Sequence, residues 1–144
     1  MQKEIKLLVL CTGNSCRSQM MHGYLEHYGG DQVQVYSAGV ETHGVNPFAI
    51  GVMAEDGVLI HQHTSNHVNK YDDIQFDVVI TVCDHAKEVC PIFPNAKRVV
   101  HHAFNDPSAG SGTSKDLIAA FRKTREEIKT FATDFISKID ESNS

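Results

Sequence analysis

The sequence predicts an α/β protein of three layers, in which helices flank a four-stranded parallel sheet. Three observations lead to this prediction: four short apolar runs, helical patterns between them, and enough chain for one core, since 41% of the 144 residues are hydrophobic. Strands that alternate with helices are joined by right-handed crossovers and therefore lie parallel. We expect one domain that covers residues 1–144.

The four apolar runs predict the strands. They lie at residues 4–10, 33–38, 76–82 and 97–101. The first contains Leu7-Leu8-Val9-Leu10, an unbroken apolar run that is typical of a strand buried on both faces. Ligands of such sheets bind beyond the carboxyl ends of the strands, so the residues after each run are candidates for a functional site.

The stretches between and after these runs predict four helices, at Ser18–Tyr28, Asn46–Asp56, Thr64–Tyr71 and Thr113–Ile139. The last has an apolar stripe at helical spacing, formed by Leu117, Phe121, Ile128, Phe131, Phe135 and Ile139. Either Thr113 or Ser114 is suited to cap its N-terminus. We expect a loop over residues 103–112 and a frayed tail over residues 140–144.

The charge balance argues against a broad nucleic-acid or membrane-binding surface. The formal net charge is −5, from 13 basic and 18 acidic residues. The start of the chain shows no basic segment followed by a long apolar stretch, and the run Ile5–Leu10 is too short to span a bilayer. We therefore expect a cytoplasmic monomer that captures any anion locally.

A loop rich in small polar residues follows the first predicted strand and reads Cys11-Thr-Gly-Asn-Ser-Cys-Arg-Ser18. Such residues tolerate a tight backbone whose N–H groups turn inward, and a helix N-terminus after them adds a partial positive charge. Arg17 supplies a bidentate fork for a tetrahedral oxyanion. The predicted oxyanion-binding residues are Thr12, Gly13, Asn14, Ser15, Cys16, Arg17 and Ser18.

Cys11 is the candidate nucleophile of this anion loop. Inward N–H groups, a helix dipole and a guanidinium favour a thiolate, and such surroundings lower a cysteine pKa from ~8.5 to ~3.5–7.5. A thiolate that attacks a tetrahedral oxyanion needs an acid for the departing oxygen. Asp106, in Asn105-Asp106-Pro107, is the candidate acid, with the capping of a turn as its alternative role. Cys16 is expected to be a packing residue.

The remaining cysteines, Cys83 and Cys90, bracket six residues after the third predicted strand. A four-cysteine zinc site normally shows Cys-x2–4-Cys spacings, which neither cysteine pair has. The histidines His61, His63 and His67 are close in sequence, but exposed loops and polar helix faces account for them. We therefore expect no bound metal and no bound cofactor.

Several motifs together resemble one family. They are Cys11-Thr-Gly-Asn-Ser-Cys-Arg-Ser-Gln-Met20, Tyr36-Ser-Ala-Gly-Val-Glu-Thr-His-Gly-Val-Asn-Pro47, His63-Thr-Ser65, Val82-Cys-Asp84, Cys90-Pro91 and Asp106-Pro107. The chain resembles the thioredoxin-coupled arsenate reductases, which share the fold of the low-molecular-weight protein tyrosine phosphatases. The resemblance runs almost from end to end.

The resemblance implies reduction of arsenate to arsenite by three cysteines in relay, and a role in arsenic detoxification. Cys11 would attack arsenate held by the loop and Arg17, while Asp106 protonates the leaving oxygen. Cys83 would then attack Cys11 and release arsenite. Cys90 would attack Cys83, and thioredoxin would supply electrons to the Cys83–Cys90 disulfide. Asn14 and Ser18 would shape the loop and bond the thiolate.

This implied disulfide requires irregular backbone. Residues seven apart on a helix lie ~10 Å apart along its axis, whereas the Cα atoms of a disulfide lie ~4.4–6.8 Å apart. We predict that the segment from Cys83 to Cys90 unwinds when the bond forms, which exposes the bond.

Two other functions remain open from the sequence. A tyrosine phosphatase of the same fold would need the loop, Arg17 and Asp106 but neither Cys83 nor Cys90. A noncatalytic redox-sensing module would oxidise at Cys11 without turning over arsenate. Several relatives also carry carboxylates where His22 and Asn66 stand and bind a monovalent cation there, so we expect that cation site to be weak or absent.

Overall fold

The computed structural model describes residues 4–84, 90–110 and 112–143. Its main elements are β1 (Ile5–Cys11), α1 (Arg17–Gly29), β2 (Val33–Gly39), α2 (Pro47–Glu55), β3 (Phe76–Thr81), β4 (Ala96–His101) and α3 (Ser114–Asn143). Three short 3-10 helices accompany them: η1 (Gly30–Gln32), η2 (Val68–Tyr71) and η3 (Pro107–Ala109). The four predicted strands are confirmed to within one residue at each end.

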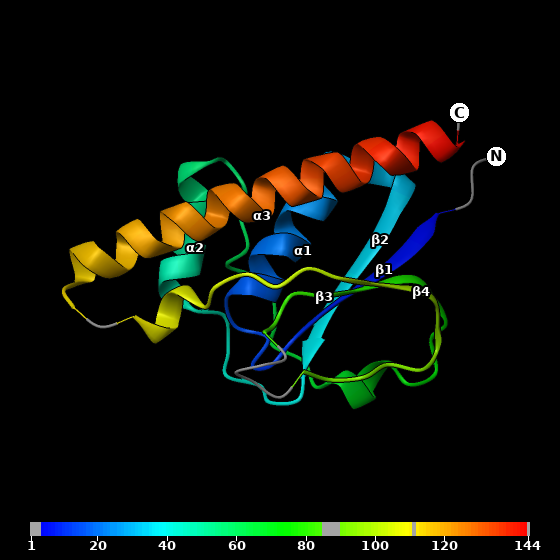
Figure 1. Ribbon diagram of the computed structural model, residues 1–144, viewed down its shortest axis with the longest axis horizontal. Helices are drawn as coiled ribbons and strands as arrows, with labels where there is room; N and C mark the ends of the chain where they lie inside the picture. The colour runs from blue at the N-terminus through cyan, green and yellow to red at the C-terminus, as the bar shows by residue number, and fades with distance from the viewer. Residues whose placement is uncertain (1–3, 85–89, 111, 144) are drawn as a thin grey trace.

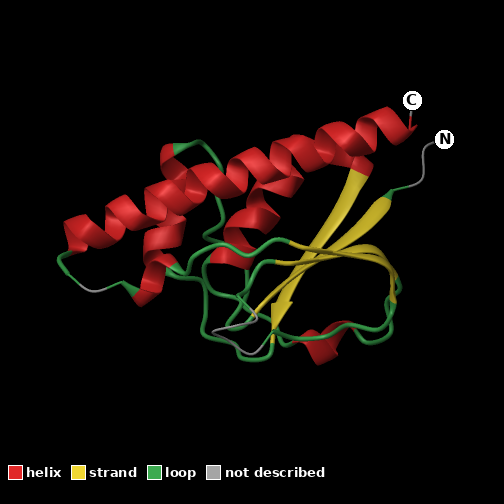
Figure 2. Cartoon of the chain, viewed as in Figure 1, coloured by secondary structure: helices red, strands yellow, loops and turns green. Residues whose placement is uncertain are grey.

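The four strands form one parallel sheet in the order β2-β1-β3-β4 (Figure 2). The central strand β1 pairs with both neighbours, and Leu7 lies opposite Val35 on one side and Val78 on the other. The predicted fold class is confirmed. Because all strands run the same way, Cys11, Thr81 and His101 end them at one edge of the sheet.

The two faces of the sheet are covered unequally. On one face, α1, α2 and α3 enclose a core that includes the fully buried Leu7, Tyr24 and Phe121 (Figure 1). On the other face, the smaller core of Leu8, Leu10, Ala38, Val68, Phe76, Val79 and Phe93 is covered by η2 and by loops. The three α-helices therefore form one layer, the sheet forms the second, and η2 with its neighbouring loops forms the third.

Three local predictions differ from the structure. The helix expected at Thr64–Tyr71 is reduced to η2, because the backbone of Thr64 and Asn66 bonds to side chains and strands elsewhere: Thr64 O accepts from Gln19, and Asn66 O accepts from the N–H of Gly39. The tail expected at 140–144 continues α3 as far as Asn143. The loop at 103–112 contains η3.

The N-terminal ends of two helices follow their sequence signals. Asn46 caps α2 by accepting a hydrogen bond from the N–H of Phe48 at 2.8 Å. At α3, the Thr113 hydroxyl accepts from the N–H of Asp116, and the Asp116 carboxylate accepts from the N–H of Thr113. Within the described ranges, no helix is long and apolar enough to cross a membrane.

Candidate active site

The loop between β1 and α1 is tightly placed by its neighbours. Cys11 ends β1 opposite Gly39 of β2, and α1 begins at Arg17. A Cβ atom on Gly39 would lie 2.5 Å from the carbonyl oxygen of Thr12 and 2.9 Å from the N–H nitrogen of Asn14. Glycine at this position therefore allows the loop backbone to lie directly against the end of β2.

Asn14 is the strained residue of this loop. It has a φ of 48° and its side chain is fully buried. Three hydrogen bonds hold it: its Nδ2 donates to the Ser37 carbonyl at 3.2 Å, its Oδ1 accepts from the Ser18 hydroxyl at 2.8 Å, and its carbonyl accepts from Gln19 at 3.1 Å. These bonds hold the left-handed conformation of Asn14 in place.

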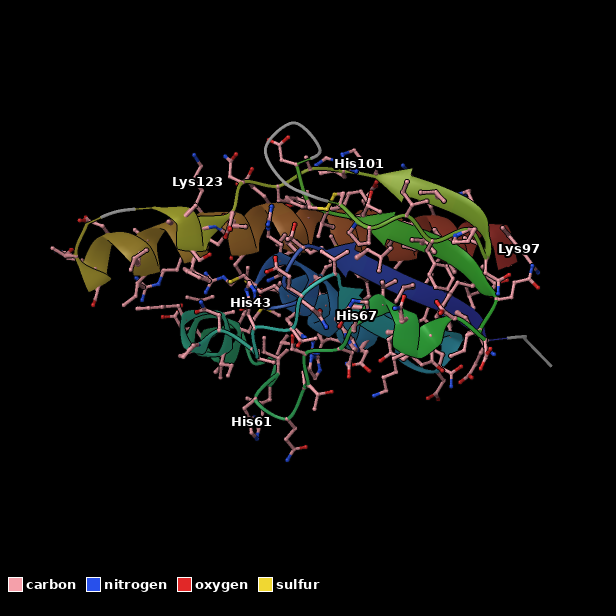
Figure 3. All side chains as sticks on the ribbon, turned by 90° about the horizontal axis from the view of Figure 1, so that it is seen from below. His43, His61, His67, Lys97, His101 and Lys123 are labelled. Carbon is pink, nitrogen blue, oxygen red and sulfur yellow. A yellow bond between two sulfur atoms is a disulfide. The ribbon has the colours of Figure 1, made fainter. Side chains whose placement is uncertain are left out.

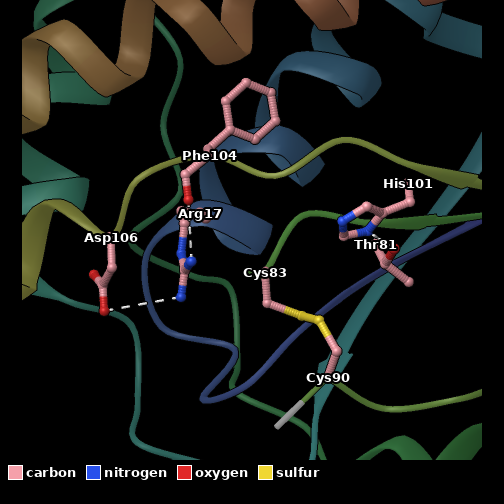
Figure 4. Close-up of a disulfide and its surroundings, with 7 residues drawn as sticks. All are labelled: Arg17, Thr81, Cys83, Cys90, His101, Phe104 and Asp106. Atoms are coloured by element: carbon pink, nitrogen blue, oxygen red, sulfur yellow. Dashed lines mark hydrogen bonds and ion pairs between the residues drawn. A yellow bond between two sulfur atoms is a disulfide. The ribbon is translucent and has the colours of Figure 1, made fainter. Parts of the chain in front are cut away.

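Arg17, the first residue of α1, and Asp106, which precedes η3, lie close together (Figure 4). The buried Arg17 donates from Nη1 to the Phe104 carbonyl at 3.2 Å, and its Nη2 lies 3.8 Å from Oδ2 of Asp106. The other Asp106 oxygen accepts from the N–H and the hydroxyl of Ser108, at 2.9 and 2.6 Å. The carboxylate is therefore oriented, while the Asp106 side chain remains 34% exposed.

A cavity of about 370 Å³ opens above the loop. Its lining includes Cys11, Arg17 and Asp106, so the structure brings the predicted nucleophile, oxyanion ligand and acid to one place. Thr12, Gly13, Ser15 and Cys16 also line it, whereas the buried Asn14 and Ser18 support the loop from behind. The sequence prediction missed His43 and Ser108, which line the same cavity.

His43 lies directly against Gly13 of the loop. The backbone N–H of His43 donates to the Gly13 carbonyl at 3.2 Å, and a Cβ on Gly13 would lie 2.8 Å from the His43 ring. The only sequence signal for this contact was the position of His43 in the second quoted motif.

The thiol of Cys16 has a raised pKa, unlike the lowered pKa that a nucleophilic cysteine needs. Its side chain is buried, and burial raises the pKa of the Cys16 thiol to about 11. The sulfur lies 3.8 Å from the hydroxyl of Ser15. At neutral pH Cys16 is therefore a protonated thiol, which agrees with the packing role expected from sequence.

Cys83 and Cys90 are joined by a disulfide, and their Cα atoms are 6.0 Å apart (Figure 4). Cys83 is fully buried, so the predicted exposure of the bond is not seen at Cys83, and the partly buried Cys90 packs against the same core that contains Cys11. The strands that lead to Cys11 and Cys83 are adjacent, and the N–H of Val82 donates to the Leu10 carbonyl at 3.0 Å. Unwinding of the segment remains a prediction, because residues 85–89 lie outside the described part of the chain.

The three histidines that are close in sequence are separated in space. His61 and His67 are exposed and labelled at different places on the surface, and His67 caps η2 (Figure 3). His63 instead packs against His22, with ring centroids 4.3 Å apart, and both contact Glu26. His22 and Asn66 line one shallow pocket, and the expectation that a monovalent-cation site there is weak or absent remains a prediction.

The geometry can be compared with known proteins. Residues 6–144 match the family model described as low molecular weight phosphotyrosine protein phosphatase. The chain belongs to this family. Among its relatives is an arsenate reductase of Halalkalibacterium halodurans, 46% identical over 136 residues, which are 92% of this chain and 97% of the relative.

Solved structures of the family have the same fold. An arsenate reductase in the phosphate binding state superposes with a TM-score of 0.80 at 30% identity, covering 94% of this chain and 98% of the other. A thioredoxin-dependent arsenate reductase of Corynebacterium glutamicum superposes with a TM-score of 0.74 at 25% identity, covering 96% of this chain and 63% of the other.

Proposed function

We propose that this chain reduces arsenate to arsenite, using Cys11, Cys83 and Cys90 in relay and thioredoxin as the electron donor. The observation that carries the proposal is the Cys83–Cys90 disulfide, which lies at the same sheet edge as Cys11 and its oxyanion cavity. The names of the relatives support arsenate as the substrate.

The first step forms a sulfur–arsenic bond. The Cys11 thiolate attacks arsenic while the loop N–H groups and Arg17 hold the oxyanion. One oxygen leaves as water after receiving a proton, and Asp106 is placed to supply that proton because its carboxylate lines the cavity. Arsenic remains pentavalent in this adduct.

The second step transfers two electrons to arsenic. Cys83 attacks the Cys11 sulfur, a Cys11–Cys83 disulfide forms, and the sulfur–arsenic bond breaks with its electron pair moving to arsenic. Arsenite leaves as the trivalent product. Cys90 then attacks Cys83, which releases Cys11 as a thiolate and leaves the Cys83–Cys90 disulfide that the structure contains.

Thioredoxin closes the cycle by thiol–disulfide exchange. Its reduction potential of about −270 mV is sufficient to reduce any protein disulfide of higher potential. The thioredoxin-dependent reductase among the structural neighbours supports this partner. No cofactor is needed, because the electrons travel through cysteines alone.

The oxyanion site would also accept phosphate esters, so we propose residual phosphatase activity. Cys11, Arg17 and Asp106 supply a nucleophile, an oxyanion ligand and an acid. Among the described residues that line the cavity, however, there is no tyrosine or phenylalanine to stack on an aryl group. Arsenate reduction therefore has the better support, and aryl phosphatase activity should be low.

The relay is tested by arsenate-dependent NADPH oxidation with thioredoxin and thioredoxin reductase. The native chain should turn over, and Cys83→Ser and Cys90→Ser should not. In a single turnover, Cys90→Ser should still release one arsenite and hold a Cys11–Cys83 disulfide, detectable by mass, whereas Cys83→Ser should release none. Both variants should keep their aryl phosphate hydrolysis, which shows an intact loop.

Two results would overturn the proposal. Sustained turnover by Cys83→Ser would remove Cys83 from the reaction. A native chain that is inactive with arsenate but hydrolyses an aryl phosphate through Cys11 would be a phosphatase, with Cys83 and Cys90 uninvolved.

A further inference from the structure

Three side chains outside the oxyanion cavity converge on one point. Nε2 of His22 lies 3.4 Å from one carboxylate oxygen of Glu26, and Nε2 of His63 lies 3.4 Å from the other. One ligand atom from each residue can be chosen so that all lie within 4.8 Å of one another. The segment that carries His63 thus completes a site begun by His22 and Glu26, which are one turn apart on α1.

These distances are those of a metal-ligand set. Nitrogen and oxygen ligands lie ~2.0–2.2 Å from a tetrahedral zinc ion, which places them about 3.4 Å from one another. Nε2 of His22 lies at that distance from one Glu26 oxygen, and Nε2 of His63 lies at that distance from the other oxygen. Two imidazoles and one carboxylate are also a donor set that first-row transition metals prefer.

The hydrogen bonds around His63 make its Nδ1 a donor. Gln19 donates from Nε2 to the carbonyl oxygens of Asn14 and Thr64, at 3.1 and 3.0 Å, so its Oε1 must be an acceptor. That oxygen lies 3.1 Å from Nδ1 of His63, which must therefore donate. Nε2 of His63 faces a Glu26 oxygen, which only accepts, so a proton or a metal ion between the two atoms satisfies this contact.

The surroundings suit a metal ion rather than a surface ion pair. The side chains of His22 and His63 are only 15% and 16% exposed, while Glu26 is 50% exposed and leaves a path for entry. Nδ1 of His22 is held by the Ser37 hydroxyl at 2.8 Å, as Nδ1 of His63 is held by Gln19. Such outer hydrogen bonds orient metal-bound imidazoles.

We propose that His22, Glu26 and His63 bind a divalent transition metal ion of the zinc class. The three residues line a shallow pocket with Gln62, Thr64 and Asn66, so a fourth coordination position faces solvent and takes water or an external ligand. None of the three ligands lines the oxyanion cavity, so the proposed metal site is spatially distinct from that cavity.

Binding of zinc and cobalt(II) to the purified chain tests this site. Competition with a chromophoric chelator should give one zinc ion per chain, and the cobalt(II) complex should show the d–d bands of a tetrahedral site without a sulfur-to-metal charge-transfer band. Glu26→Gln and His63→Ala should each weaken zinc binding more than about 10-fold, which is the lower end of the loss for outer-shell changes. Zinc should raise the melting temperature of the native chain but not that of Glu26→Gln.

His61→Ala is the matched control, because it removes an exposed histidine two residues from His63. It should bind zinc like the native chain. Equal loss in His61→Ala, a charge-transfer band from thiolates, or unchanged binding in Glu26→Gln would each overturn the proposal. A nitrogen NMR spectrum would also overturn the proposal if it showed that His63 is a protonated imidazolium at neutral pH and that its signals do not change when zinc is added.

Discussion

At the scale of single residues, the anion loop requires a glycine at position 39, where no side chain can be accommodated. Gly39 has backbone atoms of Cys11, Thr12 and Asn14 within 2.9 Å of where a Cβ would lie. These atoms belong to the main chain that holds the proposed oxyanion ligands, so they cannot move aside without disturbing the site.

Gly39→Ala should therefore lower kcat/KM for arsenate by at least about 10-fold, since a displacement of ~1 Å in a catalytic site can cost ~100-fold. The measurement is steady-state arsenate reduction with thioredoxin. Gly51→Ala is the control: Gly51 lies within α2, and a Cβ there meets nothing within 4 Å. That variant should keep its activity and gain roughly 0.5–1 kcal/mol of stability. Native kinetics in Gly39→Ala would contradict the argument.

The residues of the oxyanion site could be predicted because chemistry and topology agree there. Cys11 and Arg17 share one short loop, and Asp106 follows a strand that ends at the same sheet edge. The cluster of His22, Glu26 and His63 could not be predicted, because its third member comes from a distant segment packed on α1. The only sequence signal was the spacing of four between His22 and Glu26.

At the scale of elements, an ion-pair clasp joins α2 to α3. Glu55 accepts from Arg122 at 2.6 Å and from Arg125 at 2.7 Å. The Arg122 guanidinium beside Glu55, helped by Arg125, lowers the pKa of that carboxyl from 4.5 to about 2. Because the folded-state pKa is the lower one, the clasp stabilises the fold above pH 4.5 and loses this effect as the pH falls from 4.5 towards 2.

Glu55→Gln should reduce the loss of folding stability that accompanies a fall in pH below 4.5. Between pH 5 and pH 3, the urea midpoint of the native chain should fall more steeply than that of the variant, and the difference should shrink in high salt. Glu127→Gln, a change to an exposed carboxylate of α3, should retain the native slope. Parallel slopes for the native chain and Glu55→Gln would show that the clasp contributes nothing to stability.

The prediction of helices and strands succeeded where buried apolar residues determine the element, and it failed where polar side chains determine the backbone conformation. The runs that became β1 and β3 bury nearly every residue, so their bounds follow from composition. The stretch from Thr64 to His67 carries no apolar stripe, and its groups instead bond to Gly13, Gln19 and Gly39. A local sequence pattern does not contain these long-range partners, and for this reason the helix predicted at Thr64–Tyr71 was wrong.

At the scale of the whole molecule, the thinner side of the sheet depends on aromatic packing. Phe76 is fully buried and meets Tyr36, Phe93 and Tyr71 edge-on, with centroids 5.3, 5.4 and 6.4 Å apart. The core on this face is small, so no neighbouring side chain can fill the space that the Phe76 ring occupies.

Phe76→Ala should lower the free energy of unfolding by about 3–5 kcal/mol, as expected for a buried aromatic side chain. Val99→Ala is the control, since Val99 lies on β4 and is 58% exposed; it should change stability by less than about 0.5 kcal/mol. Urea unfolding followed by circular dichroism measures both. A loss below about 1 kcal/mol in Phe76→Ala would mean that the face repacks.

The unequal covering of the sheet has a consequence for local opening. Fewer apolar contacts must break to lift η2 and the segment of Phe93 than to separate α1 from β1, so amides on the thin side should exchange with deuterium earlier. Cys90 lies three residues before Phe93. The side of the sheet that opens more easily therefore includes backbone close to the disulfide, where an incoming thiol needs access.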